Sequence, residues 1–349
     1  MKILVTGGGG FLGSAIVQRL VHLNNDVRSL SRRFYTRLDI LGVDQIQGDI
    51  GDAKIVDKAC KDRDIIFHTA AKPPPWGKYR DYYRTNVTGT QNVISGCLRH
   101  NVSRLVYTSS PSVIFDGTDM EGVDESVPYP IKYNAFYPKT KAMAEKLVVK
   151  IAGEHLQTVV LRPHRIWGPG DPHFAPRLIA RAKKIKQIGN GKNLIDTTYI
   201  GNAVDAHILA ADKLRENPAL SGNIYFISQG APIPAWEMIN AILKAAGLGP
   251  IKGKMHHKTA WLIGGALEFI YKTFHLPGEP QMTRFIADTV ATANWFDISA
   301  ARNDLGYVPR ISIKEGLLFL KKWLEKNMTG RRKNQEKYLF HCHDRTTGC

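Results

Sequence analysis

Residues 1–13 read MKILVTGGGGFLG. The apolar run from Lys2 to Thr6 predicts a strand, the four glycines after it predict a turn, and the apolar spacing that follows predicts a helix. Three glycines keep a G-x-x-G-x-x-G spacing, which lets a backbone approach a pyrophosphate closely and then begin a helix whose N–H groups face it. The segment therefore predicts a dinucleotide site built on Gly7, Gly10 and Gly13.

The same alternation of strand and helix continues along the chain. Apolar runs at 27–31, 44–47, 64–69 and 104–108 predict strands, and the segments between them include a helix that begins after Asp52 and another over 81–100. Strands that alternate with helices of this length indicate βαβ units and a parallel sheet. We therefore predict an α/β fold: a Rossmann-type doubly wound parallel sheet with a smaller C-terminal substrate lobe.

This organisation divides the chain into three parts. Residues 1–161 are the predicted NAD(P)-binding domain, to which elements near 200–228 return, and residues 162–327 are the predicted substrate-binding lobe. Beyond 161 we expect helices over 174–186, 202–213 and 236–246 and a strand over 224–228. Residues 328–349 form a basic tail that we expect to be disordered.

The composition is that of an ordinary globular protein with an excess of positive charge. Of the 349 residues, 43% are hydrophobic and 23% are charged, and the formal net charge is +17. Such a charge fits a nucleic acid, an anionic membrane surface, an anionic ligand, or simply a solvated basic surface. Because the lysines and arginines are dispersed and neither zinc-finger nor RNA-binding signatures occur, we expect no nucleic-acid partner.

The cysteines and the first residues indicate the compartment. Four cysteines, at 60, 97, 342 and 349, are too few and too scattered for a disulfide framework in a chain of this size. A strand that begins at Lys2 leaves no room for a secretory signal, so we expect a cytoplasmic protein. We predict no metal site, because the cluster His341-Cys342-His343 offers too few ligands.

The end of the second predicted strand reads Ser31-Arg32-Arg33. In dinucleotide-binding units an acidic residue at this place holds the ribose 2′-hydroxyl, whereas an arginine accommodates a 2′-phosphate. This favours NADP(H) over NAD(H), although two solvated arginines in a loop would look the same. After the fourth strand, the small residues Ala70 and Ala71, followed by Lys72, would let the cofactor backbone pass close by.

A second constellation carries groups suited to acid–base chemistry. Ser109 and Ser110 follow the strand at 104–108, and Tyr137 precedes Lys141 by one helical turn. A phenol has a pKa of about 10, and a neighbouring ammonium favours the phenolate and lowers that pKa. Tyr137 would donate a proton to a carbonyl oxygen while one of the serine hydroxyls hydrogen-bonds the same oxygen. Of the 13 tyrosines, only Tyr137 has a lysine four residues later.

These motifs occur in an order that resembles the extended short-chain dehydrogenase/reductases, over about residues 1–325. The segments that carry the resemblance are Thr6-Gly7-x-x-Gly10-x-x-Gly13, Asn86-Val87-x-Gly89-Thr90-x-Asn92, Tyr107-Thr108-Ser109-Ser110, Tyr137-x-x-x-Lys141 and the run from Leu161 to Asp171. Within that family the chain is similar to the 3β-hydroxysteroid dehydrogenase and sterol-4-carboxylate dehydrogenase branch.

The resemblance implies a role for each matching residue. Ser110 aligns with the hydroxyl that polarises the carbonyl, although two adjacent serines leave the choice between Ser109 and Ser110 open. Tyr137 aligns with the general acid, and Lys141 with the group that binds the nicotinamide ribose and lowers the tyrosine pKa. The remaining cofactor contacts that we expect, besides the glycines, Arg32, Arg33 and the segment 70–72, are Phe11, Leu12, Asp49, Ile50, Asn86, Pro163, His164 and Ile166.

A narrower resemblance suggests the reaction. Segments 166–171, 191–200 and 276–285, together with Ala71-Lys72 and Trp76-Gly77, are similar to the 2-alkyl-3-oxoalkanoate reductases of bacterial long-chain olefin biosynthesis. This implies NADPH-dependent reduction of a long-chain β-keto acid to the 3-hydroxy acid, a hydrophobic small-molecule substrate, a homodimer, and association with other enzymes of the pathway. The alternatives are a sterol or 3β-hydroxysteroid dehydrogenase working with NAD(P), with or without decarboxylation, and a non-catalytic NADP-sensing protein.

The most apolar segment, Thr259 to Leu276, reads TAWLIGGALEFIYKTFHL. Charges at Glu268 and Lys272 make it too interrupted for a confident transmembrane helix. Three interpretations remain open: a helix of the core, a lid over a long-chain substrate, or an interfacial helix that makes peripheral contact with a membrane.

Overall fold

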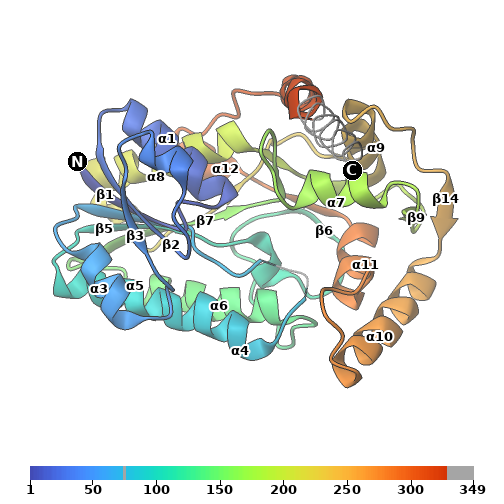
Figure 1. The fold of residues 1–349 in the computed structure, drawn as a ribbon, viewed down its shortest axis with the longest axis horizontal. Coiled ribbons are helices and arrows are strands. Elements are labelled where there is room, and N and C mark those ends of the chain that lie inside the picture. Colours follow the sequence, from blue (N-terminus) through green and yellow to red (C-terminus); the bar gives the residue numbers. More distant parts are fainter. Residues whose placement is uncertain (74–75, 328–349) are drawn as a thin grey trace, which may run out of the picture.

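The computed structural model describes residues 1–73 and 76–327, and its centre is a seven-stranded parallel sheet (Figure 1). The strand order is β12-β7-β5-β4-β1-β2-β3, so the direction of winding reverses between β1 and β4. The predicted doubly wound sheet is therefore confirmed. In chain order the strands are β1 (Lys2–Thr6), β2 (Asp26–Ser31), β3 (Asp44–Gln47), β4 (Ile65–His68), β5 (Arg104–Thr108), β7 (Gln157–Pro163) and β12 (Ile224–Ile227).

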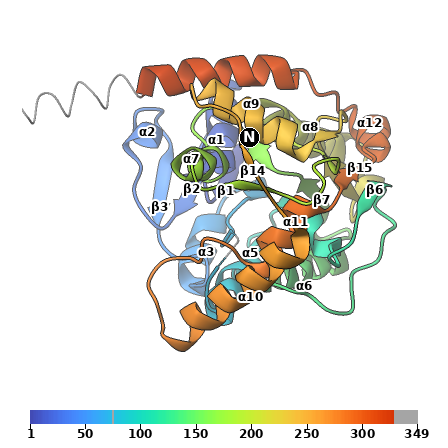
Figure 2. The same cartoon turned by 90° about the vertical axis from the view of Figure 1, so that its right-hand side faces the viewer.

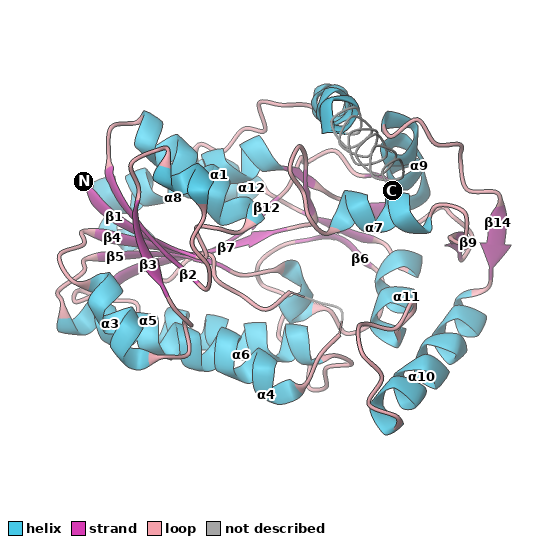
Figure 3. Cartoon of the chain, in the orientation of Figure 1, coloured by secondary structure: helices cyan, strands magenta, loops and turns pink. Residues whose placement is uncertain are grey.

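Helices cover both faces of this sheet (Figures 1 and 3). One layer contains α1 (Phe11–His22), α8 (Ile200–Glu216) and α12 (Ser299–Leu305), and the other contains α3 (Ala53–Cys60), α5 (Gly89–Arg99) and α6 (Phe136–Lys150). Because the sheet is buried on both sides, its strands read as continuous apolar runs; Ile3, Leu4 and Val5 are all buried in β1. Strand β12 and helix α8 bring residues near 200–228 back onto this sheet.

The segment predicted as one helix over 81–100 is divided. It consists of α4 (Tyr79–Tyr82), a π-helical turn (Tyr83–Thr88) and α5. The apolar spacing of the sequence does not show this change in winding, because one wide turn shifts the helix faces only slightly. The Asp52 carboxylate caps α3 as predicted, accepting from the Lys54 N–H at 2.9 Å.

The second lobe has small sheets and its own core around Trp167 and Trp236. A four-stranded sheet has the order β13-β10-β15-β6, in which β6 (Met120–Val123) comes from the N-terminal half of the chain. The short ladders pair β11 with β8 and β14 with β9. The remaining strands are β8 (Ile166–Trp167), β9 (Lys186–Ile188), β10 (Leu194–Ile195), β11 (Thr198–Tyr199), β13 (Ile233–Pro234), β14 (Gly253–Met255) and β15 (Asn294–Phe296).

The helices of this lobe are α7 (Phe174–Arg181), α9 (Ala235–Ala245), α10 (His257–Thr273), α11 (Arg284–Ala291) and one over 313–327. The predicted helix over 174–186 was therefore too long. After α7 ends at Arg181 the chain turns, and Lys186 begins β9 because that strand finds a partner in β14, a non-local pairing that local spacing does not reveal. The tail over 328–349 lies outside the described residues.

Helix α10 lies at the periphery of the lobe (Figure 2), so the interpretation of 259–276 as a core helix was wrong. Only Ala260 and Gly264 of this helix are buried, while most of its large apolar side chains are exposed. No helix in the described part of the chain is long and apolar enough to cross a membrane.

Candidate active site

The glycine loop joins β1 to α1 at the carboxyl edge of the sheet. Gly7 has a φ of +71°, and a Cβ there would lie 2.9 Å from the Ala70 backbone, so glycine is required. A Cβ on Gly13 would collide with the Gly7 carbonyl oxygen, so Phe11 and Leu12 in the first helical turn lie close to the loop. No side chain caps α1, which leaves its first N–H groups free to bind an anion.

The loop after β4 is tied to α6 through Asn86. The backbone N–H of Lys72 donates to Asn86 Oδ1 at 2.8 Å, and Asn86 Nδ2 donates to Thr140 Oγ1 at 3.0 Å. Asn86 is buried in the π-helical turn, a local widening that is frequent at functional sites. These bonds place Ala70, Ala71 and Lys72 next to the helix that carries Tyr137 and Lys141.

Ser110 and Tyr137 meet where β5 ends and α6 begins. Ser110 hydrogen-bonds Tyr137 and lowers its pKa, but burial has the larger effect, so the pKa of Tyr137 is raised above its usual value. Tyr137 is therefore a protonated phenol at neutral pH, which is the form a proton donor needs. The neighbouring Ser109 hydroxyl is buried without a hydrogen-bond partner, so the geometry favours Ser110 as the serine that acts with Tyr137.

Lys141 is buried one turn further along α6, and its ammonium is already engaged. Nζ donates to the Tyr107 hydroxyl and to the Thr108 carbonyl, both at 2.7 Å. Burial lowers the pKa of Lys141 to about 7, while nearby Glu145 acts in the opposite direction. The expectation that Lys141 lowers the Tyr137 pKa is therefore not met: burial of Tyr137 dominates and raises its pKa.

His164 and Arg165 follow β7, the strand that pairs with β5. The Arg165 Nε donates to His164 Nε2 at 3.1 Å, which assigns the imidazole proton to Nδ1, and that atom is buried without a partner. Burial and the Arg165 charge lower the His164 pKa, so the ring is neutral. Pro163 and Ile166 flank this pair, at the end of β7 and the start of β8.

Arg165 is held rigidly but lacks an anionic partner. Its φ is +45°, an uncommon backbone conformation for a non-glycine residue, and its Nη2 donates to the Thr289 carbonyl at 2.5 Å. Burial lowers the Arg165 pKa to about 10. No carboxylate in the part of the chain that the structure describes forms an ion pair with this half-buried guanidinium. The sequence analysis missed Arg165, for which the only signal was a positive charge within the motif from Leu161 to Asp171.

Behind α6, a buried ion pair fixes the helix to β7. Arg162 donates from Nη2 to Glu145 Oε1 at 2.6 Å and from Nε to Oε2 at 3.2 Å, and the Tyr129 hydroxyl donates to Oε1 at 2.7 Å. Both charged side chains are buried. Because Glu145 lies one turn after Lys141, the pair sets the position of the face of α6 that carries Lys141.

Three arginines follow β2 near the glycine loop. All three are exposed, and Arg37 in α2 (Thr36–Asp39) also donates from Nη2 to the Gly9 carbonyl at 2.6 Å. The Gly9 N–H donates to the Ser31 hydroxyl at 2.9 Å. Arg37 thus contacts the loop directly. The sequence analysis missed it, because the strand-end pattern covers only the residues that directly follow β2.

Asp49 and Ile50 follow β3, the edge strand beside β2. The Asp49 Oδ1 accepts from the Gly51 N–H at 2.7 Å, and the Ile50 side chain is buried against Gly89. The two residues therefore form a fixed turn at the carboxyl edge of the sheet, where the first βα units of such a fold bind the adenosine half of a dinucleotide.

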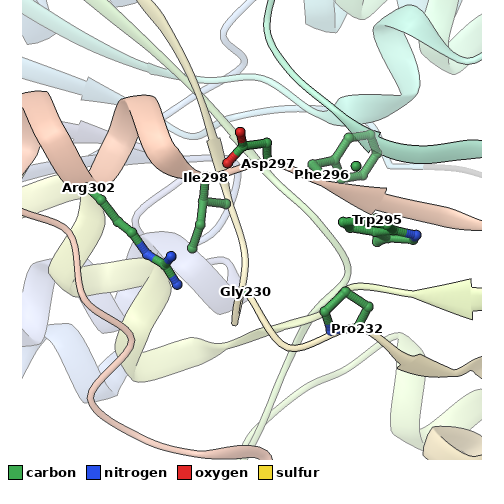
Figure 4. A pocket seen from close by; sticks show the side chains of 8 residues that line it. Gly230, Pro232, Trp295, Phe296, Asp297, Ile298 and Arg302 are labelled. Carbon is green, nitrogen blue, oxygen red and sulfur yellow. The ribbon is translucent and has the colours of Figure 1, made fainter.

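A separate surface cavity has a volume of about 330 Å³, and Figure 4 shows the side chains that line it. It is lined by Gly122, Gly230, Pro232, Trp295, Phe296, Asp297, Ile298 and Arg302, none of which is a predicted site residue. Phe296 connects it with the site above, because its ring lies 5.1 Å from that of His164 in an edge-on contact. Among residues 1–73 and 76–327, no cluster of three or more His, Cys, Asp or Glu side chains could hold a metal ion.

The residues present fit a dinucleotide cofactor. The glycine loop leaves no room for a Cβ, α1 begins without a side-chain cap, and the His164 Nδ1–H is a buried donor without an acceptor. The first two features match the needs of a pyrophosphate, and the third offers a hydrogen bond at the opposite end of the site.

Comparison with known proteins agrees with this geometry. The sequence profile of the 3-beta hydroxysteroid dehydrogenase/isomerase family matches residues 4–255. The chain belongs to this family. It is 45% identical to the 2-alkyl-3-oxoalkanoate reductase of Stenotrophomonas maltophilia (strain K279a) over 92% of this chain and 98% of that protein. It is 34% identical to the decarboxylating sterol-4-alpha-carboxylate 3-dehydrogenase ERG26 of Candida albicans, over 94% of this chain and 98% of that protein.

A solved structure extends the comparison to the fold and the cofactor. The structure titled "MoeE5 in complex with UDP-glucose and NAD" is 25% identical, with a TM-score of 0.73 over 94% of this chain and 100% of that one. The protein is thus an NAD(P)-dependent oxidoreductase of the extended short-chain dehydrogenase/reductase fold, which confirms the predicted family, fold class and nicotinamide cofactor.

Proposed function

We propose that the protein reduces a 2-alkyl-3-oxoalkanoate with long alkyl chains to the 2-alkyl-3-hydroxyalkanoate, with NADPH as the reductant. The observation that carries the proposal is Arg165, a half-buried cation without a carboxylate partner among the described residues, which follows β7, the strand that pairs with β5 ahead of Ser110. A buried charge without a counterion costs folding free energy, which favours a role in binding an anionic ligand.

The names of the two relatives describe one shared substrate geometry. A 2-alkyl-3-oxoalkanoate carries its oxygen at C3, two carbons from the carboxylate carbon, and a sterol-4-carboxylate that reacts at C3 has the same relation between carboxylate and oxygen. A site for either substrate therefore needs a cation near the proton donor. We assign that role to Arg165, so the proposed substrate class is a β-oxo or β-hydroxy carboxylate.

We assign the proton transfer to Tyr137 and the binding of the carbonyl oxygen to Ser110. When bound, NADPH supplies the hydride, which goes to the C3 carbonyl carbon. The C=O π bond breaks as that C–H bond forms, and the Tyr137 phenol gives its proton to the oxygen, which becomes the 3-hydroxyl. The Ser110 hydroxyl donates a hydrogen bond to the same oxygen, and Lys141 binds the nicotinamide ribose.

The Arg165 assignment predicts a loss of selectivity for the acid. In Arg165→Met we expect kcat/KM for the keto acid to fall by about 10²–10³, the effect of truncating one partner of a buried charge pair. Turnover of the matching ketone that lacks the carboxyl group should stay unchanged. For the keto acid, kcat/KM of Arg165→Lys should lie between that of the original chain and that of Arg165→Met.

The control is Arg302→Met, which removes a second arginine that forms no ion pair within the described residues, from the cavity of Figure 4. If Arg302→Met rather than Arg165→Met abolished the preference for the acid, the carboxylate would bind in that cavity. If Arg165→Met reduced turnover of acid and ketone equally, Arg165 would have only a structural role.

We propose NADPH rather than NADH because Arg32, Arg33 and Arg37 all lie near the β2 end where a 2′-phosphate would bind. In Arg37→Ala, KM for NADPH should rise about 10-fold or more through loss of a charge-assisted hydrogen bond, while KM for NADH should hardly change. Steady-state kinetics with both cofactors measure the two values, with Arg215→Ala on the exposed end of α8 as control. Equal KM changes for both cofactors would contradict the assignment.

The second candidate is oxidation of a sterol-4-carboxylate at C3, which the relative from Candida albicans supports. The higher identity to the reductase favours the open-chain keto acid. A non-catalytic sensor is set aside, because the relatives are named as enzymes and the protein keeps Ser110, Tyr137 and Lys141. The division at residue 161, the cytoplasmic location, the homodimer and the association with pathway enzymes stay predictions.

A further inference from the structure

The charged side chain of Lys141 has more N–H groups than the protein itself engages. Nζ donates to the Tyr107 hydroxyl and to the Thr108 carbonyl oxygen, both at 2.7 Å. An ammonium group offers three donors, so one N–H group is left for a further acceptor. Both bonds end on the last two residues of β5. The positions of Tyr107 and Thr108 therefore decide where the third N–H group of Lys141 points.

The Tyr107 hydroxyl is held from one face of the sheet by a hydrogen-bonded chain that leads to His68. Tyr107 hydrogen-bonds the Thr90 hydroxyl, and Thr90 Oγ1 in turn donates to the Asn86 carbonyl oxygen at 2.6 Å. Because the Thr90 proton is used in that bond, Thr90 accepts from Tyr107 and, at 2.9 Å, from His68 Nε2. The rings of His68 and Tyr107 also contact each other, with centroids 5.4 Å apart.

The bonds of His68 fix its tautomer. Nε2 carries the proton that Thr90 accepts. Burial, together with the charge of Lys141, lowers the pKa of His68 to about 3, so the ring is neutral and Nδ1 is an acceptor. Nδ1 accepts from the Thr6 hydroxyl at 2.7 Å, and Thr6 is the last residue of β1 before the glycine loop. The neutral ring therefore supports Tyr107 without adding a positive charge beside the Lys141 ammonium.

Thr108 is held in a similar way from the opposite face of the sheet, by His207 on α8 (Figure 1). The His207 Nδ1–H donates to the Ala203 carbonyl oxygen at 2.7 Å. Burial lowers the pKa of His207 to about 4, so the ring is neutral and Nε2 accepts from the Thr108 hydroxyl at 2.8 Å. Each of the two acceptors of Lys141 is thus linked, directly or through Thr90, to a buried neutral histidine.

We propose that His68 and His207 are positioning residues that direct the third N–H group of Lys141 to the nicotinamide ribose. This inference rests on the proposed function, in which Lys141 binds that ribose. His68, His207 and Tyr107 are each at most 1% exposed, so water does not compete for their hydrogen bonds. Loss of either support would leave a buried polar group without its partner and would let the long lysine side chain take other rotamers.

The number of N–H groups on Lys141 makes cofactor binding depend on pH. Burial lowers the pKa of Lys141 to about 7, and Glu145, which is paired with Arg162, acts in the opposite direction. The other titratable side chains around Nζ, from β4, β5 and α6, are uncharged at neutral pH: His68, Tyr107 and Tyr137. Above its pKa Lys141 keeps only two N–H groups, which the end of β5 engages. NADPH affinity should therefore fall as pH rises through the pKa of Lys141.

The test is the Kd of NADPH, measured by fluorescence titration from acidic to alkaline pH. Tyr107→Phe removes one acceptor of the Lys141 ammonium, so Kd at neutral pH should rise by about 10-fold. The fall in affinity should also begin at lower pH, because the charged form loses a stabilising bond. Lys141→Met should remove the part of the pH dependence that the lysine causes. The control Tyr307→Phe removes a buried hydroxyl that donates to the Ser228 carbonyl at 3.0 Å and should leave Kd unchanged.

The two histidines allow a matched pair of substitutions, because in both rings Nε2 faces the Lys141 side and Nδ1 faces away from it. A glutamine amide reaches the place of Nε2 and keeps the bond to Thr90 or Thr108, whereas the shorter asparagine amide reaches only the place of Nδ1. His68→Asn and His207→Asn should raise Kd by about 3–10-fold, the effect of one neutral hydrogen bond. His68→Gln and His207→Gln should raise it by about twofold or less.

Equal Kd values for the glutamine and asparagine variants would overturn the proposal, because the histidines would then only support the fold. An unchanged Kd in Tyr107→Phe at every pH would overturn it as well. Thermal unfolding establishes that each variant is folded, and Tyr107→Phe tests the same bonds if a histidine variant does not fold. If Lys141→Met binds NADPH like the original chain, the assignment of Lys141 to the ribose fails, and this inference fails with it. None of these measurements needs a substrate, so they are independent of which carbonyl compound the protein reduces.

Discussion

Replacing Tyr137 with phenylalanine should lower kcat for carbonyl reduction by about 10²–10⁴, the usual contribution of a positioned general acid. Binding of NADPH should stay unchanged, because the substitution removes one hydroxyl and keeps the ring that contacts Tyr82. Ser110→Ala should lower kcat by about 10²–10³, since it removes the second hydrogen bond to the same oxygen. Single-turnover kinetics measure the chemical step for both variants.

The pH profile gives a second readout of the same assignment. Burial raises the pKa of Tyr137, so its proton is present at neutral pH and is lost only as pH rises through that raised value. The reduction rate should therefore be flat with respect to Tyr137 through neutral pH and fall at alkaline pH, and Tyr137→Phe should abolish that fall. Tyr133→Phe is the matched control, because the Tyr133 hydroxyl donates only to the Val113 carbonyl. Full turnover in Tyr137→Phe would disprove the assignment.

The second large effect concerns stability. Glu145→Ala should lower the free energy of unfolding by about 3–5 kcal/mol, because it leaves the Arg162 guanidinium buried without its counterion. The Tyr129 hydroxyl loses its acceptor as well. Equilibrium unfolding in urea measures the change, and the slope of the transition shows whether the unfolding stays two-state.

Two control variants test whether the loss of stability in Glu145→Ala comes from the buried Arg162 charge. Asp57→Ala breaks the surface contacts of Asp57 with Arg99 and with His100 and should change stability by no more than about 1 kcal/mol. The double variant Glu145→Leu/Arg162→Met removes both charges and should recover much of the lost stability. A change below about 1 kcal/mol in Glu145→Ala would mean that Arg162 is not desolvated as the structure shows.

Local patterns in the sequence predict the parts of the fold that depend on near neighbours. The run from Lys2 to Gly13 predicts strand, turn and helix because each step follows from apolar spacing and from glycine. Tyr137 and Lys141 share a face of α6 because four residues make about one helical turn. The repeated strand–helix pattern implies right-handed βαβ connections, which restrict the possible strand orders.

Features that depend on distant contacts could not be predicted in this way. Glu145 and Arg162 lie on α6 and β7, and only packing brings them together. The Arg165 side chain is positioned by a positive φ and by the carbonyl of Thr289, neither of which leaves a local signal. For α10, the apolar composition does not show whether the helix packs inside the protein or presents its apolar side chains to an outside partner.

The cofactor preference and the pKa of Tyr137 show the same limit. The pattern at Arg32 and Arg33 indicates a basic strand end, but Arg37 lies closer to the glycine loop because α2 folds back over it. The sequence places Lys141 one turn from Tyr137, yet its ammonium is directed to Tyr107 and Thr108. The direction and the burial of the side chains decide the cofactor preference and the Tyr137 pKa. Residue spacing in the sequence does not reveal either property.

The central claim is tested most directly by incubating the protein with NADPH and a long-chain 2-alkyl-3-oxoalkanoate and identifying the product by mass spectrometry. We predict one NADPH oxidised for each 2-alkyl-3-hydroxyalkanoate formed, with little turnover of 3-ketosteroids or sugar nucleotides. Absence of keto-acid reduction by a folded, NADPH-binding protein, together with oxidation of a 3β-hydroxysteroid 4-carboxylate, would contradict the proposed function.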